Sequence, residues 1–308
     1  AAGKILSGAV TVTGGSIKLG ETGTLASTVT MSGGTLDADE TLTLSGALTQ
    51  SGNITIAVAE NKTLGYSGAA VNLGAYTLTM SGKGTFNNTN ALVLNDASSK
   101  LLFTNTGTVG SASTSLASLG VDVDEDSTIT SLAVGHTTPV SIADGKTLSG
   151  GITVTAGSIK LGETGTLASA VTMSGGTLDA DETLTHSGAL SHTADITIDV
   201  AENKILTYSG TAINVGANTI TLSGGGSLVS GGMSLNDAQS KLLLNSITLD
   251  SASTSANNSG VDVDDSSTIT ALAVGHTTPV SIAAGKILSG AVTVTGGSIK
   301  LGETGTLA

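Results

Sequence analysis

Residues 9–19 read AVTVTGGSIKL, a strict alternation of apolar and polar side chains on either side of a Gly-Gly corner. Val10 and Val12 share one side of an extended chain and the threonines share the other, because successive side chains of a strand point to opposite faces. Ile17 and Leu19 resume the same pattern after the glycines. Short β-branched runs of this kind, separated by glycine-containing corners, predict β-strands of three to five residues.

An apolar residue that follows Thr, Lys or Ser, directly or one residue later, recurs along the chain, and we treat it as the anchor of a repeating coil. The anchors are Leu6, Leu25, Leu42, Leu64, Leu78, Leu101, Ile129 and Leu148, followed by Leu167, Leu184, Leu206, Ile220, Leu242, Ile269 and Leu288. The steps between them average about 20 residues. In the first copy the shortest step runs from Leu64 to Leu78 and the longest from Leu101 to Ile129. The longest step predicts either bulging surface loops or a second, hidden turn.

The period predicts an all-β fold, a parallel β-solenoid (β-helix) with coils of about 20 residues. A single coil cannot bury its apolar side, whereas stacked coils bury one continuous aliphatic column. We therefore expect almost no helix, anchors stacked in one column, and a set of buried aliphatic side chains. That set is Val10, Val12, Ile17, Leu19, Ile54, Ile56, Val121 and Val123.

A longer repeat contains the coils. Residues 1–26 are identical to residues 283–308, the phrase VTMSGGTLDADETLT recurs at 171–185 after its first copy at 29–43, and GHTTPVSIA recurs at 275–283 after 135–143. We predict one continuous solenoid made of a first super-repeat (1–142), a second (143–282) and the start of a third (283–308). We expect the chain to be a segment of a longer tandem array.

The composition excludes several classes of function. The 308 residues include 43 glycines and no cysteine, aromatics make up 2% and charged residues 11%, and the net charge is -13. All 11 basic residues are lysines, so the clustered positive charge and guanidinium groups that nucleic-acid binding uses are missing. Disulfides are excluded. No apolar run is long enough for membrane insertion of this segment.

Phrases such as LSGAVTVTGGSIKLGETGTL (6–25) and TMSGGTLDADETLTLSGAL (30–48) resemble the β-helical repeat regions of bacterial autotransporter and filamentous-haemagglutinin-type surface adhesins. The resemblance covers the whole chain through its repeat pattern and composition. It implies a secreted stalk, located extracellularly at the cell surface, that holds a cell to a surface, a neighbour or a host. The super-repeat of this chain is more regular than those stalks usually show.

The best enzymatic alternative is a polysaccharide-degrading β-helix, whose site would gather carboxylates on one sheet. Asp37, Asp39 and Glu40 form such an acidic cluster, which recurs as Asp179, Asp181 and Glu182. Acidic residues at strand corners are usually solvated turn residues. We therefore predict that the protein is not an enzyme and has no cofactor.

Asp122, Asp124 and Asp126 are the candidate metal ligands. Carboxylates at alternate positions present hard oxygens of the kind that Ca²⁺ prefers. The second copy has Ser266 in place of the third carboxylate, and the intervening Val121 and Val123 explain the pattern as a solvated edge of a strand. Ca²⁺ binding by these aspartates remains the alternative to a solvated strand edge.

The four histidines and the Thr-x-Thr pairs carry weaker signals. His136 and His276 are equivalent loop residues, whereas His186 and His192 replace Leu44 and Gln50 of the first copy and are therefore not expected to form a ligand pair. Outward Thr-x-Thr pairs suggest an ice-binding face, but the unequal steps between anchors argue against one.

The sequence thus predicts a non-catalytic structural repeat of an extracellular fibre or surface stalk, which spaces or adheres cells. The runner-up is an adhesin whose outer face binds surface glycans or like chains. The expected partners are copies of the chain itself, end to end or through further repeats, and other cells. An uncapped solenoid end exposes unpaired strand groups that favour such association.

Overall fold

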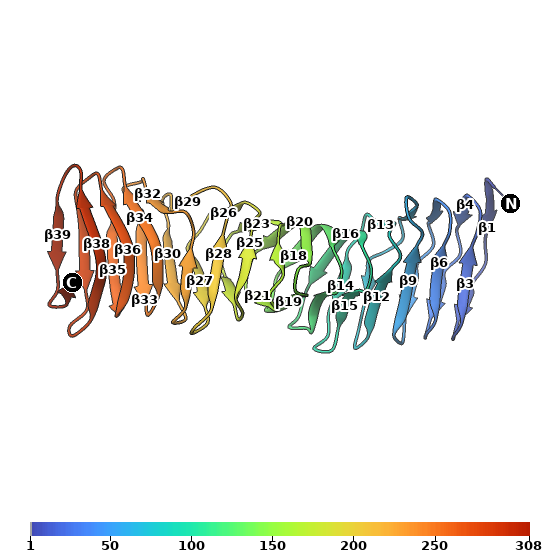
Figure 1. Ribbon diagram of the computed structural model, residues 1–308. Coiled ribbons are helices and arrows are strands. Elements are labelled where there is room, and N and C mark those ends of the chain that lie inside the picture. Colours follow the sequence, from blue (N-terminus) through green and yellow to red (C-terminus); the bar gives the residue numbers. More distant parts are fainter. Residues whose placement is uncertain (1) are drawn as a thin grey trace. The chain divides into compact units, whose positions relative to one another are not determined.

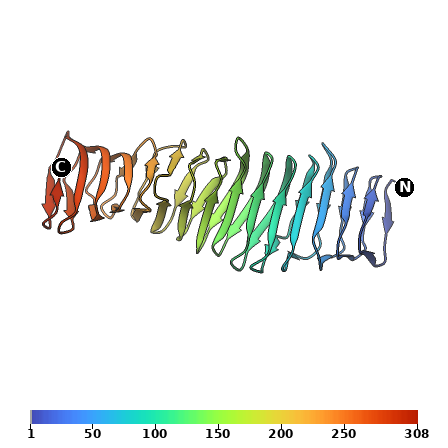
Figure 2. The same cartoon turned by 60° about the horizontal axis from the view of Figure 1, so that its bottom comes forward.

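A computed structural model describes residues 2–308 and confirms the parallel β-solenoid, with about 15 turns and coils of about 20 residues. Residues 2–308 contain no helix, as predicted, and therefore no helix that could cross a membrane. The chain divides into two compact units, a first up to Thr153 and a second from Val154 to Ala308. Within each unit, successive turns of the ribbon lie side by side (Figures 1 and 2).

Each coil has three sides, which we number in chain order as face 1, face 2 and face 3. Face 1 is the side that has a separate strand in every coil. Face 1 of the first unit contains seven strands within the described residues: β3 (Ser16–Leu19), β6 (Thr35–Ala38), β9 (Ile54–Val58), β12 (Thr77–Ser81), β15 (Lys100–Phe103), β17 (Gly120–Val123) and β19 (Thr138–Ile142). Successive strands of this series pair in parallel, from β3 to β19.

Faces 2 and 3 of the first unit begin as separate short strands and merge in the later coils. Face 2 holds β1 (Lys4–Leu6), β4 (Gly23–Leu25), β7 (Leu42–Leu44), β10 (Thr63–Tyr66) and β13 (Thr85–Asn88). Face 3 holds β2 (Val10–Val12), β5 (Val29–Met31), β8 (Leu48–Gln50), β11 (Val71–Asn72) and β14 (Leu92–Leu94). The long strands β16 (Gly107–Thr114), β18 (Ser127–Val134) and β20 (Thr147–Val154) then cover both faces; β16 pairs with both β13 and β14.

The second unit repeats this order. Its face 1 contains β21 (Ser158–Gly162), β24 (Thr177–Ala180), β27 (Ile196–Val200), β30 (Thr219–Ser223), β33 (Lys241–Asn245), β35 (Gly260–Asp265), β37 (Thr278–Ile282) and β39 (Ile299–Gly302). Its face 2 contains β22 (Thr166–Leu167), β25 (Leu184–His186), β28 (Ile205–Tyr208), β31 (Ser227–Val229) and β40 (Thr306–Leu307). Its face 3 contains β23 (Ala170–Met173), β26 (Leu190–His192), β29 (Ile213–Asn214) and β32 (Met233–Leu235), and the long strands β34 (Thr248–Thr254), β36 (Ser267–Val274) and β38 (Ile287–Val294) cover both faces.

The core is a stack of inward side chains in register. On face 1, Ile17, Leu36 and Ile56 are direct partners in successive coils, and the column continues through Met80 and Phe103. The period of two residues along each strand, combined with parallel register between strands, buries the same set of positions in every coil.

Coils in the middle of the first unit are wider than those at its start. The partner of Ile56 in the next coil is Met80, a longer interval along the chain than that from Ile17 to Leu36. This extra width accommodates buried aromatic rings, including Tyr66 and Phe86, which stack with centroids 5.9 Å apart.

The predicted core is confirmed for Val12, Ile54, Ile56, Val121 and Val123, which are all buried. The other three predicted core residues, Val10, Ile17 and Leu19, are only half-buried. They belong to the first described coil, in which strands β2 and β3 each have a strand partner on one side. Their side chains therefore point inward as predicted. They are only half-buried because their strands have a strand partner on one side only.

The prediction that all anchors stack in one column is wrong. Leu64 and Ile129 lie on face 2, in β10 and β18, whereas Leu78 and Leu101 lie on face 1, in β12 and β15. A polar residue followed by an aliphatic one begins strands on both faces, so the phrase does not mark one position of the coil. Direct partners on face 1 are spaced far more evenly along the chain than the anchors are.

The longest apparent step, from Leu101 to Ile129, contains one ordinary turn and no hidden second one. Leu101 pairs with Val121 in the next coil, and the chain then crosses to face 2 to reach Ile129. The shortest step, from Leu64 to Leu78, is the matching crossing from face 2 to face 1 within less than a full coil.

Candidate functional site

The acidic cluster predicted at Asp37, Asp39 and Glu40 forms ion pairs with lysines from adjacent coils. Lys18 Nζ lies 3.5 Å from Asp37 Oδ2 and 3.0 Å from Asp39 Oδ2, and Lys62 Nζ lies 2.5 Å from Glu40 Oε2. The hydrogen bond to Asp39, with the charges of both aspartates, raises the pKa of Lys18. A catalytic pair would need one free acid and one free base, whereas these carboxylates each join one coil to the next.

The second copy rebuilds the same contacts. Lys160 Nζ lies 3.4 Å from Asp179 Oδ2 and 3.1 Å from Asp181 Oδ2, and Lys204 pairs with Glu182. Burial, followed by repulsion from Asp181, raises the pKa of Asp179. The cluster is therefore a repeated structural contact between coils in both super-repeats.

Asp122, Asp124 and Asp126, the candidate calcium ligands, have three different environments. Asp122 pairs with Lys100, Asp126 Oδ1 accepts a hydrogen bond from the backbone N–H of Thr147 at 2.8 Å, and Asp124 is exposed. The neighbouring Glu125 forms an ion pair with Lys146, whose Nζ lies 2.6 Å from Glu125 Oε2. Across residues 2–308, no group of three or more histidine or acidic side chains is arranged to hold a metal ion.

The second copy shows why Ser266 can replace Asp126. Ser266 Oγ accepts a hydrogen bond from the backbone N–H of Ile287 at 3.1 Å, the same contact that Asp126 makes one super-repeat earlier. Asp265 takes the place of Glu125, with Lys286 Nζ 2.8 Å from Asp265 Oδ1. The hydrogen bond from Lys286 lowers the pKa of Asp265. Both copies therefore have, at this position, a side-chain oxygen that accepts a backbone N–H of the next coil.

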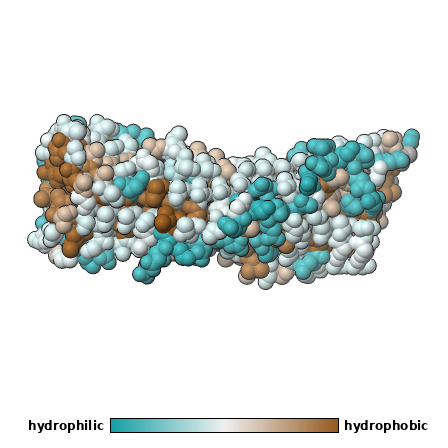
Figure 3. Space-filling model, viewed as in Figure 1, coloured by the Kyte–Doolittle hydropathy of each residue, from teal (hydrophilic) through white to brown (hydrophobic). Residues whose placement is uncertain are grey.

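Eight lysines thus form one set of inter-coil ion pairs that is the same in both copies. The pairs of the first copy join Lys18 to Asp37 and Asp39, Lys62 to Glu40, Lys100 to Asp122 and Lys146 to Glu125. Those of the second join Lys160 to Asp179 and Asp181, Lys204 to Glu182, Lys241 to Asp262 and Lys286 to Asp265. The face drawn in Figure 3 is mostly of intermediate hydropathy, with separate hydrophilic and hydrophobic clusters.

Outward hydroxyl groups form ladders along the stacking direction. On face 3 of the first unit, Thr11, Thr30 and Thr49 are direct register partners. On face 2, the parallel register extends from Thr63 through Thr85 to Thr108 and Thr128. Because the coils stack in register, the uneven anchor steps no longer argue against a regular threonine face.

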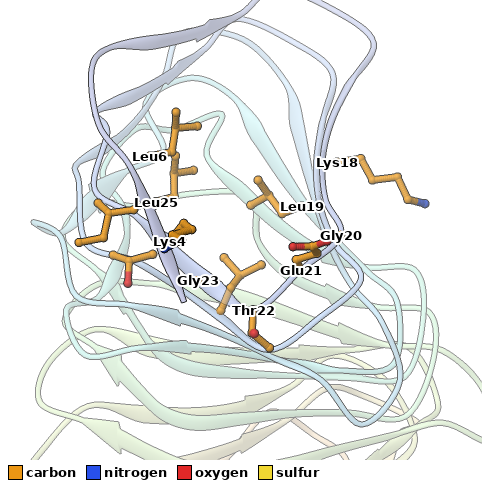
Figure 4. Close-up of a pocket in the computed structure, with 12 residues that line it drawn as sticks. Lys4, Leu6, Lys18, Leu19, Gly20, Glu21, Thr22, Gly23 and Leu25 are labelled. Atoms are coloured by element: carbon orange, nitrogen blue, oxygen red, sulfur yellow. The ribbon is translucent and has the colours of Figure 1, made fainter. Parts of the chain in front are cut away.

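A cavity of about 500 Å³ lies in the first coil. Figure 4 shows Leu6, Leu19 and Leu25 directed into the coil and Lys18 extending away from it. The equivalent of Leu6 one super-repeat on, Leu148, is buried. The cavity is therefore lined by core positions of the solenoid together with the polar side chains of Lys4, Lys18, Glu21, Thr22 and Thr24.

The histidines lie in different environments, and the sequence analysis missed the burial of one of them. His136 and His276 lie in equivalent corners, where each carbonyl accepts a hydrogen bond from the hydroxyl of the Thr two residues on. His186 instead is fully buried in the core. The signal was available, since His186 replaces Leu44 at an inward position of the alternating phrase TLTL.

Comparisons of the chain with protein-family models, with curated proteins and with solved structures find no match.

Proposed function

We propose that this solenoid is a non-catalytic structural repeat of an extracellular fibre or surface stalk, which spaces or attaches cells. One observation carries the proposal: the same lysine–carboxylate contacts join neighbouring coils in both super-repeats. In the described residues these charged groups connect coil to coil, and Lys18 alone among them also lines the cavity of the first coil. Charged groups used in this way support the stacking of coils.

Such a stalk would work through its hydrogen-bonded ladders. Each coil is bonded to the next by parallel strand pairing on its faces, as for Ile17 with Leu36 and Val10 with Val29. Seven coils form one super-repeat, as the seven face 1 strands between Ser16 and Ile142 show. At a strand spacing of about 4.8 Å, each super-repeat would add about 34 Å to a stalk.

The proposed location is extracellular, at the cell surface, in line with the resemblance to autotransporter and filamentous-haemagglutinin-type adhesins. The proposed partners are further copies of the solenoid, end to end or through more repeats, with surface glycans or other cells bound by the outer face. Parallel strand pairing from coil to coil supports the addition of further coils, since a strand edge is a template for another strand. The net charge of -13 supports the absence of nucleic acid among the partners.

A second candidate function, binding to ice, is favoured by the threonine ladders. Thr11, Thr30 and Thr49 form one rank, and Thr13, Ser32 and Ser51, two positions further along the same coils, supply a second rank of hydroxyls. Two ranks at the strand spacing form a regular array that could order water. Thr30→Lys should abolish any inhibition of ice recrystallisation by the full chain; no inhibition by the unmodified chain would remove this candidate.

The stalk proposal is tested by adding one more copy of residues 143–282 to the full chain. Electron microscopy should show a particle about 34 Å longer. When the two chains are displayed on the surface of a bacterium, the extended chain should hold neighbouring cells further apart than the original chain does. A constant particle length, or release of reducing sugars from polysaccharides by the purified chain, would overturn the proposal.

A further inference from the structure

The two super-repeats differ in one fully buried residue of face 2. In the first unit, Leu44 pairs with Leu25 on one side and with Tyr66 on the other. In the second unit, His186 takes this position between Leu167 and Tyr208. His186 and Leu44 are both 0% exposed. An ionisable ring thus occupies a core position that an aliphatic side chain fills in the matching coil.

The contacts of His186 suit only the neutral ring. Its Nε2 lies 3.1 Å from the carbonyl oxygen of Ser169, which can only accept, so Nε2 carries the proton. Nδ1 is buried and has no hydrogen-bond partner among the described residues. The ring of Tyr208 lies against the imidazole, with centroids 5.3 Å apart, and its hydroxyl accepts the N–H of Leu190. A second proton, on Nδ1, would be buried without an acceptor.

No carboxylate compensates for that charge from the strands around the ring. The strand partners β22 and β28 contribute one titratable group, the phenol of Tyr208. Asp179 of β24 and Asp199 of β27 alternate with buried neighbours and so point outward. Burial accordingly lowers the pKa of His186, and the hydrogen bond to Ser169 offsets only part of this effect.

His192, the other histidine of this coil, provides a contrast. Its two ring nitrogens lie 3.1 Å from the carbonyl oxygen of Ala194 and 3.0 Å from that of Asn214. Both carbonyls can accept a hydrogen bond from the ring, so protonation of His192 leaves no N–H without a partner. Of these two histidines, His186 is the one whose second proton would have no acceptor.

We propose that the second super-repeat contains an acid-sensitive joint: at mildly acidic pH the side chain of His186 takes up a proton and the coils from β22 to β28 open, while the matching coils around Leu44 stay closed. The unfolded segment binds the proton more readily than the folded one, so stability rises with pH. The contribution of the neutral His186 ring to stability is complete above the ordinary histidine pKa of 6.5, and it is lost as the pH falls below that value.

Hydrogen exchange of the full chain between pH 8 and pH 5 tests the joint. After correction for intrinsic exchange, the protection factors of residues 166–208 should fall by up to about tenfold per pH unit below 6.5. Those of residues 24–66, the matching coils, should stay nearly constant. His186→Leu, which installs the residue of the first copy, should remove the pH dependence, and Leu44→His should create one in residues 24–66.

His192→Gln, which installs Gln50 of the first copy, is the control and should leave the pH dependence of residues 166–208 in place. Equal pH profiles for the two segments would overturn the proposal. So would a dependence that persists in His186→Leu, because it would have to come from carboxylates or from His192.

Discussion

Asp126 Oδ1 accepts the backbone N–H of Thr147 at 2.8 Å and so joins one coil to the next through a single side-chain oxygen. The second copy makes this bond with Ser266, although the residue type has changed. The position therefore requires an acceptor of short reach, and a negative charge is not needed there. From the sequence this position was interpreted as part of a solvated strand edge or, alternatively, as a calcium ligand that the second copy loses, and neither interpretation included the bond to the next coil.

Removal of this acceptor should loosen the junction. We expect Asp126→Ala to lower the free energy of unfolding by about 0.5–1.5 kcal/mol and to abolish the protection of the Thr147 amide from hydrogen exchange. Asp126→Ser should keep most of that protection, since Ser266 holds Ile287 in the same way. If Asp126→Ser behaves like Asp126→Ala, the carboxylate has a role beyond this bond.

Tyr66 and Tyr208 offer a matched pair of buried hydroxyls. Tyr66 Oη accepts the N–H of Leu48 at 3.1 Å and donates to the carbonyl of Ala69 at 2.6 Å, whereas Tyr208 Oη accepts the N–H of Leu190. Tyr66→Phe should cost about 1–3 kcal/mol, because the buried N–H of Leu48 and the part-buried carbonyl of Ala69 both lose their partner. Tyr208→Phe should cost less in denaturant unfolding; equal costs would show that the Ala69 bond adds nothing.

Gly120 is held in a backbone conformation that only glycine fits. Its φ is 81°, and a Cβ there would lie 1.9 Å from the carbonyl oxygen of Pro139 in the next coil. We expect Gly120→Ala to destabilise the chain by more than the roughly 1–3 kcal/mol of local backbone strain. Gly145, with φ 70° and open space around its Cβ, is the control and should show the strain alone. Similar losses in thermal unfolding would contradict the steric argument.

Asp199 faces Asp179 across neighbouring strands of the second unit, at a position where the first copy has Ala57. Burial and Asp181 are the main causes that raise the pKa of Asp179, and the charge of Asp199 adds to them. Asp199→Ala should therefore lower this pKa, as measured by NMR titration of the Asp179 carboxyl.

The sign of the linked stability effect follows from the raised pKa. The folded chain binds the Asp179 proton more tightly than the unfolded one, so the contribution of Asp179 falls as pH rises above 3.8. Asp199→Ala should reduce this loss of stability with rising pH. Ser223→Ala, which removes the hydroxyl that donates to Asp199 but keeps the Asp199 carboxylate, is the comparison variant. An unchanged Asp179 titration in Asp199→Ala would rule out the repulsion.

The strand faces were predictable from the sequence because they depend on local geometry. Alternation of apolar and polar residues placed Ile54, Ile56, Val121 and Val123 inside, and all four are buried. The super-repeat also told which residues of the two copies correspond, so that the ion pair of Lys62 with Glu40 has its counterpart in Lys204 with Glu182. The candidate site was less predictable, because its carboxylates were assigned without knowledge of the lysines that meet them.

By itself, then, the sequence determined that this chain is all-β, which side of each strand is buried and that the coils form a solenoid, since a two-residue period and a repeat of about 20 residues are visible along one chain. Only the tertiary structure decided the face on which Leu64 and Leu78 lie, the length of each coil and the partners of Lys18 and Asp126. These depend on register between residues one coil apart, which strand pairing on three faces and the length of each corner fix together. The same register placed His186 in the core.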